Sequence, residues 1–174
     1  MKIIGSVKED LSLEKRNSVS LETVKKFVDL NFSVLLEKNY GTHIGISDEK
    51  YKSKGATFFS SAKEVLEKSE IILKVNLPSI NEIEIIKSKS FLIGQFDTFS
   101  NKETINKLIK KDIKIFSLNL LPRITRAQSM DVLSSQANLA GYRAVIESVK
   151  EFSQAVPMMM TAAGTVAPAK VLII

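Results

Sequence analysis

Short apolar runs alternate with helix-like segments along the first two thirds of the chain, and this alternation constrains the fold most. Five runs are rich in Ile, Leu, Val and Phe, as buried parallel strands are. They are Lys2–Val7, Ser33–Glu37, Ile71–Val75, Phe91–Phe96 and Ile113–Ser117. The segments between them carry apolar residues every three or four positions, which is typical of helices that cover a sheet. The sequence therefore predicts an α/β fold of the Rossmann or flavodoxin type, with a parallel sheet and helices on both faces.

Helix signals lie in the gaps between these runs. Ser20 precedes a segment in which Val24, Phe27 and Val28 share one face, so we expect it to cap a helix there. Three further helices are predicted at Ser61–Lys68, Ile80–Lys87 and Lys102–Lys111.

The pattern changes near residue 133, where a single long helix is predicted to run to about Phe152. We expect three parts: an N-terminal α/β domain at 1–132, a long interdomain helix at 133–152, and a segment at 153–174. That last segment reads as a connector followed by a buried parallel strand, Ala169–Ile174, which would be the first strand of a further domain.

Composition excludes several classes of protein. Apolar residues make up 44% and charged residues 25% of the chain, as in ordinary soluble domains. No apolar run approaches the roughly 20 residues that span a bilayer, and the start of the chain becomes charged too soon for a signal peptide. The absence of Cys excludes disulfides and thiolate chemistry. From these three absences we expect a cytoplasmic protein. The net charge of +6 comes from lysines that are interleaved with acidic residues, so we do not expect the chain to bind nucleic acid.

Arginine is concentrated in one segment. Only four of the 25 Lys and Arg residues are Arg, and Arg123, Arg126 and Arg143 all fall within 120–146. The planar guanidinium holds a partner in a fixed orientation, which Lys does not. Several short hydrogen-bonding side chains share the segment: Gln128, Ser129, Asp131, Ser134, Ser135, Gln136 and Asn138. Two interpretations remain open, a ligand site that needs fixed geometry and a polar loop and helix cap held by internal Arg–Asp pairing.

The same segment carries a family resemblance. Residues 123–138, RITRAQSMDVLSSQAN, resemble the nicotinamide-contacting loop of proton-translocating NAD(P) transhydrogenases. The similarity continues through 139–146 and 161–174, and more weakly from Gly5-Ser-Val-Lys-Glu9 onward, so it covers essentially the whole chain. The chain resembles the N-terminal NAD(H)-binding component of the transhydrogenase alpha subunit, within the alanine dehydrogenase and transhydrogenase family.

This resemblance implies an oxidoreductase fragment that is inactive alone. Arg123, Gln128, Asp131 and Ser134 would orient the nicotinamide and ribose of NAD(H), with no catalytic residue and no metal ligand of their own. Hydride would pass to NADP(H) on a partner subunit, coupled to proton translocation by the full assembly. The expected partners are a second copy of the chain and the NADP(H)-binding and membrane-spanning components. The resemblance also implies an alternative location, in which the protein is bound peripherally at the inner face of the cytoplasmic membrane and is not free in the cytoplasm.

An alanine dehydrogenase-like oxidoreductase is the first alternative. Arg16 and Lys74 resemble the Arg and Lys with which those relatives hold a keto acid. However, Asn17 and Leu21 depart from the family's usual residues, and 95–98 lacks the expected histidine. We therefore expect structural roles, with Arg16 pairing to Glu9 or Glu14 and Lys74 closing a strand end. The single histidine, His43, has no ligand partners in its sequence neighbourhood and is a poor metal or catalytic candidate.

The end of the chain bears on a second alternative. In a Rossmann unit, a strand such as 169–174 leads into a glycine-rich turn that holds a pyrophosphate, and no G-x-G-x-x-G occurs in this sequence. We expect the chain to be truncated before that turn, although a short family member that ends in a strand remains possible. The missing turn also leaves open a non-catalytic dimerisation or interaction domain.

Overall fold

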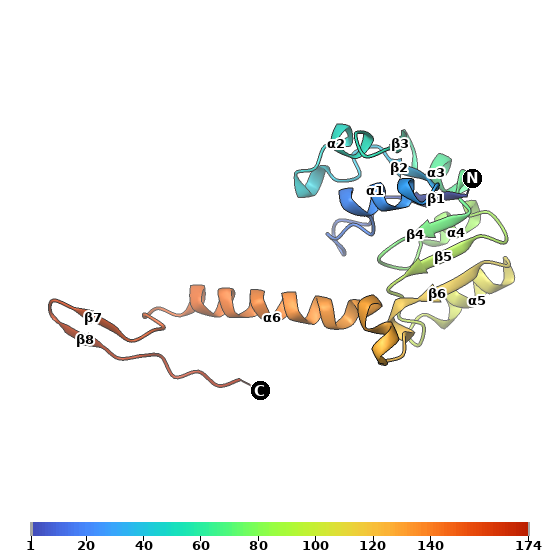
Figure 1. The fold of residues 1–174 in the computed structure, drawn as a ribbon. Coiled ribbons are helices and arrows are strands. Elements are labelled where there is room, and N and C mark those ends of the chain that lie inside the picture. Colours follow the sequence, from blue (N-terminus) through green and yellow to red (C-terminus); the bar gives the residue numbers. More distant parts are fainter. Residues whose placement is uncertain (1, 174) are drawn as a thin grey trace. The chain divides into compact units, whose positions relative to one another are not determined.

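The computed structural model describes residues 2–173, which divide into two units between Met130 and Asp131. The first unit is built around a six-stranded sheet in which every pair of neighbouring strands is parallel (Figure 1). Its strands are β1 (Ile3–Ser6), β2 (Ser33–Glu37), β3 (Ala56–Phe59), β4 (Ile71–Leu73), β5 (Phe91–Gly94) and β6 (Lys114–Ser117).

The strand order is β3-β2-β1-β4-β5-β6, so the chain winds outward from β1 in one direction and then outward from β4 in the other. This is the doubly wound order of dinucleotide-binding sheets, and the winding reverses between β1 and β4. All five predicted strands are present, and the predicted parallel α/β fold is confirmed. The prediction missed β3, a four-residue edge strand in which only Ala56 is buried and in which the exposed Thr57 interrupts the apolar run.

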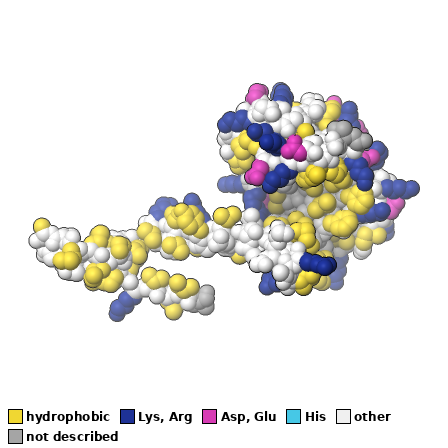
Figure 2. All heavy atoms as spheres, in the orientation of Figure 1, with side chains coloured by type: hydrophobic (Ala, Val, Ile, Leu, Met, Phe, Trp, Pro, Cys, Tyr) yellow, Lys and Arg dark blue, Asp and Glu magenta, His cyan; other side chains and the backbone are white. Residues whose placement is uncertain are grey.

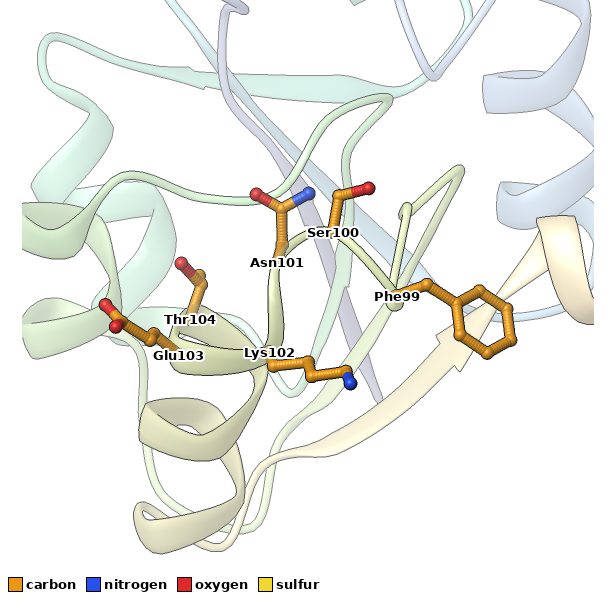
Figure 3. Close-up of a pocket in the computed structure, with 6 residues that line it drawn as sticks. All are labelled: Phe99, Ser100, Asn101, Lys102, Glu103 and Thr104. Carbon is orange, nitrogen blue, oxygen red and sulfur yellow. The ribbon is translucent and has the colours of Figure 1, made fainter.

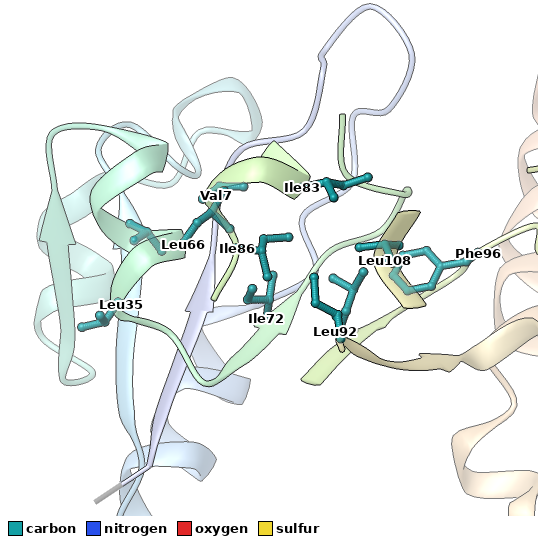
Figure 4. Packing of buried hydrophobic residues seen from close by; sticks show 11 residues of the cluster. Val7, Leu35, Leu66, Ile72, Ile83, Ile86, Leu92, Phe96 and Leu108 are labelled. Carbon is teal, nitrogen blue, oxygen red and sulfur yellow. The ribbon is translucent and has the colours of Figure 1, made fainter. Parts of the chain in front are cut away.

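Helices cover both faces of the sheet, as predicted. On β2, Leu35 packs into one buried cluster, whereas Val34 and Leu36 pack into another, because alternate side chains of a strand point to opposite faces. Figure 4 shows the first cluster, to which α3 (Ala62–Lys68), α4 (Ile80–Ile85) and α5 (Lys102–Lys110) contribute buried residues. The second cluster includes buried residues of α1 (Leu21–Asp29) and α2 (Asp48–Lys52).

Serine side chains define where three of these helices begin. Ser20 accepts a hydrogen bond from the Thr23 N–H at the start of α1, as predicted. Ser61 and Ser79 take part in capping boxes at α3 and α4, in which a glutamate three residues later bonds back to the cap. Local sequence therefore fixes these starts independently of the sheet.

The second unit contains one long helix and a hairpin. Helix α6 (Val132–Glu151) differs by one residue at each end from the predicted helix. Within the predicted connector, β7 (Met159–Thr161) and β8 (Gly164–Val166) form an antiparallel pair that the sequence did not predict. The turn between them depends on Gly164, whose φ of 130° disfavours any residue with a side chain.

The strand predicted at 169–174, as the first strand of a further domain, stays a prediction. No strand is assigned at 169–173, and Val171 and Leu172 are exposed, because no neighbouring strand within residues 2–173 pairs with them. Residue 174 lies outside the described part.

Surface composition differs along the chain (Figure 2). Lys and Arg side chains are interspersed with Asp and Glu on the visible face, which fits a solvated lysine surface. Exposed apolar side chains gather on α6, and they are Leu133, Leu139, Tyr142, Val145, Ile146 and Val149. No helix among the described residues is long and apolar enough to cross a membrane.

Candidate functional site

The first candidate site lies where β1 and β4 end, since open α/β sheets bind ligands at the carboxyl ends of strands where the winding reverses. Lys74 directly follows β4, and only 4% of its side chain is exposed. Its ammonium lies 2.8 Å from Glu82 Oε1 of α4 and 3.6 Å from Glu9 Oε2 of the loop after β1. This buried cation is therefore held by two carboxylates of the chain itself.

Glu9 also satisfies the backbone at this strand end. Its Oε1 accepts a 2.7 Å hydrogen bond from the Val75 N–H. Burial raises the pKa of Glu9, while the Lys74 ammonium and the Val75 N–H act in the opposite direction. Such a buried carboxylate is tolerable only because charged and polar donors surround it.

Arg16, the other cation of the alanine dehydrogenase-like pair, binds Glu14. Its Nη2 lies 2.7 Å from Glu14 Oε2 and its Nε lies 2.9 Å from Glu14 Oε1, a two-point contact. The hydrogen bond from Arg16 lowers the pKa of Glu14. The sequence left Glu9 and Glu14 open as partners of Arg16, and this contact is with Glu14. Both cations that could hold a keto acid are thus engaged by carboxylates of the chain.

A network of hydroxyl groups also lies at the ends of β1 and β4. Ser6 Oγ lies 2.8 Å from both Ser18 Oγ and Tyr40 Oη, and both serine hydroxyls donate to the Leu73 carbonyl. Tyr40 Oη accepts from the Val19 N–H, and burial raises the pKa of Tyr40. Sequence reasoning missed this network because its members are far apart in the chain and carry no motif.

The predicted nicotinamide-binding residues divide between the two units. Arg123 and Gln128 belong to the first unit, where Gln128 lies in a short 3₁₀ segment, Thr125–Met130. Both side chains are exposed, and within the described residues of that unit Arg123 forms no ion pair.

Asp131 and Ser134 belong to the second unit and contact each other at the start of α6. The Ser134 N–H donates to Asp131 Oδ1 over 3.0 Å, and the Ser134 hydroxyl donates to Asp131 Oδ2 over 2.6 Å. Asp131 is thus the N-cap of α6. The sequence left open a polar loop and helix cap held by Arg–Asp pairing, and the helix cap is present. Arg143, the third arginine of the 120–146 segment, pairs with Glu147 within α6 and not with an Asp.

Other features of the described residues offer weaker sites. A shallow pocket surrounds the turn that begins α5, lined by Phe99, Ser100, Asn101, Lys102, Glu103 and Thr104 (Figure 3). Asp97 accepts hydrogen bonds from the Phe99 and Ser100 N–H groups there, so the turn satisfies its own donors. His43 Nε2 contacts the Lys15 carbonyl at 2.9 Å. Among the described residues, no group of three or more His, Cys, Asp or Glu could hold a metal ion.

Comparison with known proteins places this geometry in a family context. The model of the family described as "Alanine dehydrogenase/PNT, N-terminal domain" matches residues 5–140. The chain is 43% identical over 175 residues to the first portion of the NAD(P) transhydrogenase alpha subunit of Rhodospirillum rubrum, across 98% of this chain and 46% of that protein. It is 29% identical over 139 residues to an alanine dehydrogenase of Methanococcus maripaludis, across 80% of this chain and 37% of that one.

A solved structure of a transhydrogenase is also similar to this chain. The crystal structure of transhydrogenase from Sinorhizobium meliloti superposes with a TM-score of 0.90 and 43% identity, over 97% of this chain and 50% of that one. The chain thus spans about half the length of these two transhydrogenase relatives.

Proposed function

The chain belongs to the family of alanine dehydrogenase/PNT N-terminal domains, and on this premise we propose that it is the N-terminal part of an NAD(P) transhydrogenase alpha subunit. In this role it positions the nicotinamide of NAD(H) for hydride transfer to NADP(H). The higher identity to a transhydrogenase subunit than to an alanine dehydrogenase supports this choice within the family.

One structural contrast carries the proposal. Lys74 and Arg16 are engaged by carboxylates of the chain, whereas Arg123 is exposed and forms no ion pair within the described residues of the first unit. A cation that already has a carboxylate partner must lose it before it can bind a ligand. Arg123 therefore offers a guanidinium that has no carboxylate partner in its own unit, whereas Lys74 and Arg16 already have such partners.

The chemistry of the segment suits hydride transfer between two nicotinamides. Oxidation of an amino acid needs a group that manages protons as hydride leaves. Transfer between nicotinamides involves no proton transfer at the reacting carbons, so orientation of the two rings supplies most of what the protein contributes. A set of donors and acceptors without a catalytic acid or base is sufficient for that task.

Within this set, each residue has a separate role toward the nucleotide. Arg123 donates to acceptor atoms of the nicotinamide carboxamide, and Gln128 can both donate and accept. The Ser134 hydroxyl already donates to Asp131, so it presents its lone pairs to the ligand. Asp131 and Ser134 together form an acceptor pair suited to ribose hydroxyls.

The complete assembly extends this role beyond the chain. NADP(H) sits on a partner subunit, and a membrane-spanning component couples hydride transfer to proton translocation, at the inner face of the cytoplasmic membrane. A second copy of the chain is a further partner, and the exposed apolar side chains of α6 support such pairing because large exposed apolar patches mark interfaces.

An enzyme assay separates this function from its alternatives. The full-length subunit is combined with its NADP(H)-binding partner, and transfer between the nucleotides is followed by absorbance beside a reaction that contains NAD and saturating alanine. We expect transfer between nucleotides and no alanine-dependent NADH formation. Alanine turnover without transfer would favour the alanine dehydrogenase alternative, and neither activity would favour a non-catalytic interaction domain.

A further inference from the structure

The two faces of the sheet differ in burial at β5 and β6. On one face, Leu92 of β5 is fully buried beside Ile72 of β4, in the cluster to which α3, α4 and α5 contribute (Figure 4). On the opposite face, the cluster that includes residues of α1 and α2 takes its buried strand residues from β2 and β3. Neither cluster contains a buried residue of β5 or β6 that points to this second face.

Six side chains of this second face lie in two rows. The strand register sets Leu73, Ile93 and Phe116 side by side in one row, and Ile71, Phe91 and Lys114 in the other. None of the six residues is buried. Phe116 is 53% exposed, and its ring stacks on that of Phe91 with the centroids 6.1 Å apart. Together these six residues form the open sheet face.

The sequence of β5 is typical of a strand that is buried on both faces. Its residues 91–94, Phe-Leu-Ile-Gly, form a continuous apolar run without polar alternation. Parallel strands have such runs because both faces of a parallel sheet are normally covered. At β2 of the same sheet both faces are covered, since Leu35 and Leu36 point to opposite faces and both are buried. The open sheet face therefore has the composition of a covered surface, but no cover for it among the described residues.

Two occupants could supply this cover, a second copy of the chain or another segment of the same subunit. Lys114 lies on the open sheet face, with its ammonium 5.2 Å from the centroid of the Phe91 ring. Two copies that met through this face about a twofold axis would each bring a Lys114 to the contact, because such an interface uses the same patch twice. Like charges that face each other disfavour association, so the second copy is the weaker choice.

We propose that an apolar segment of the full-length subunit, from the part outside residues 1–174, packs on the open sheet face against Phe91, Ile93 and Phe116. This inference rests on the proposed function, which takes the chain to be part of a longer subunit. The chain spans about half the length of its two transhydrogenase relatives. A subunit of their size thus has about as many residues again from which such a segment can come.

Thiol labelling at position 116 tests this inference. The 174-residue chain has no cysteine, so Phe116→Cys introduces a unique thiol, and mass spectrometry identifies the same labelled peptide in the full-length subunit. We expect this thiol to react with a maleimide on the order of tenfold more slowly in the full-length subunit than in the 174-residue chain, because the covering segment must first open.

Leu30→Cys is the matched control. Leu30 is also a large apolar residue, is 66% exposed, and follows α1 at a distance from β5 and β6 in the sheet order. Its thiol should react at similar rates in both forms of the protein. Equal rates for Phe116→Cys in the two forms would overturn the proposal.

Protein concentration separates the two occupants. In the 174-residue chain, the labelling rate of Phe116→Cys should not depend on concentration. Labelling that slows as the concentration of the 174-residue chain rises would assign the open sheet face to a second copy and overturn the proposal.

Hydrogen exchange of the unchanged proteins replaces labelling if Phe116→Cys does not fold. Peptides that contain β6 should exchange more slowly in the full-length subunit than in the 174-residue chain, whereas peptides that contain β2, already covered on both faces, should exchange alike. Equal exchange of β6 in both forms contradicts the inference.

Transfer between the nucleotides is measured on the same full-length protein. Protection of position 116 without transfer would count against the proposed function alone. Transfer without protection would count against this inference alone.

Discussion

Asp131 caps α6 and is proposed to contact the nucleotide, and substitutions at this position can separate the two roles. Its Oδ1 accepts from the Ser134 N–H at 3.0 Å and caps α6, while its Oδ2 accepts from the Ser134 hydroxyl at 2.6 Å. Loss of an N-cap side chain costs about 1 kcal/mol of helix stability, whereas Asn caps as well as Asp. Asp131→Ala should therefore destabilise α6 by about 1 kcal/mol, and Asp131→Asn should leave it nearly unchanged.

The effect on hydride transfer should follow a different order. Asn keeps one oxygen for the cap, but its other terminal atom is an NH₂ donor, which cannot accept from the Ser134 hydroxyl or from a ribose. Both substitutions should therefore slow transfer, and a nicotinamide displaced by about 1 Å can lose on the order of 100-fold in rate. NADH binding should weaken much less, because the rest of the dinucleotide keeps its contacts.

Two measurements check this prediction. Urea unfolding followed by far-ultraviolet circular dichroism reports the stability of the 174-residue chain. Single-turnover hydride transfer at saturating nucleotide, in the full-length subunit with its partner, reports the alignment of the nicotinamide. If Asp131→Asn transfers hydride at the unchanged rate while Asp131→Ala is slow, Asp131 acts only as a helix cap and the reasoning is refuted.

Three further predictions concern binding, packing and pH. The 174-residue chain alone should bind NADH very weakly, because the 123–134 segment in its proposed role would contact only the nicotinamide end of the dinucleotide; micromolar binding in a calorimetric titration would contradict this. Gly94→Ala should destabilise the chain by about 1–3 kcal/mol in urea unfolding, because its Cβ would lie 2.1 Å from the Lys74 carbonyl oxygen. Gly141→Ala, in α6 with nothing within 4 Å, should instead stabilise it by about 0.5–1 kcal/mol. Glu14 has a pKa below its ordinary value of 4.5, so its charged form stabilises the fold above pH 4.5, and this stabilisation is lost as the pH falls further. In Glu14→Gln the melting temperature should therefore fall less steeply with acidification than in the unchanged chain.

Much of the first unit could be predicted from the sequence because its signals are local. The buried strands are short apolar runs, and Ser20 begins a helix whose apolar residues share one face. The order of the strands could not be predicted, since periodicity does not say which strands pair. The edge strand β3 and the hairpin of β7 and β8 were missed because they lack a buried apolar run: one residue of β3 is buried, and none of β7 or β8 is.

The sites were predictable to different degrees. Arg123, Gln128, Asp131 and Ser134 were predicted as nucleotide contacts from a resemblance, and that role stays a prediction. Glu14 was one of the two partners expected for Arg16, because these residues are close in sequence. The contacts of Lys74 with Glu9 and Glu82 depend on how the strand ends meet in space, which no local pattern encodes.

The most direct test of the central claim compares two arginines. Arg123 is exposed and forms no ion pair within the described residues of the first unit, whereas Arg16 binds Glu14 at two points. Single-turnover hydride transfer is measured at saturating nucleotide in the full-length subunit with its NADP(H)-binding partner, for Arg123→Ala and Arg16→Ala. We expect a loss on the order of 100-fold for Arg123→Ala and little change for Arg16→Ala. An unchanged rate in Arg123→Ala, with a large loss in Arg16→Ala, would contradict this expectation.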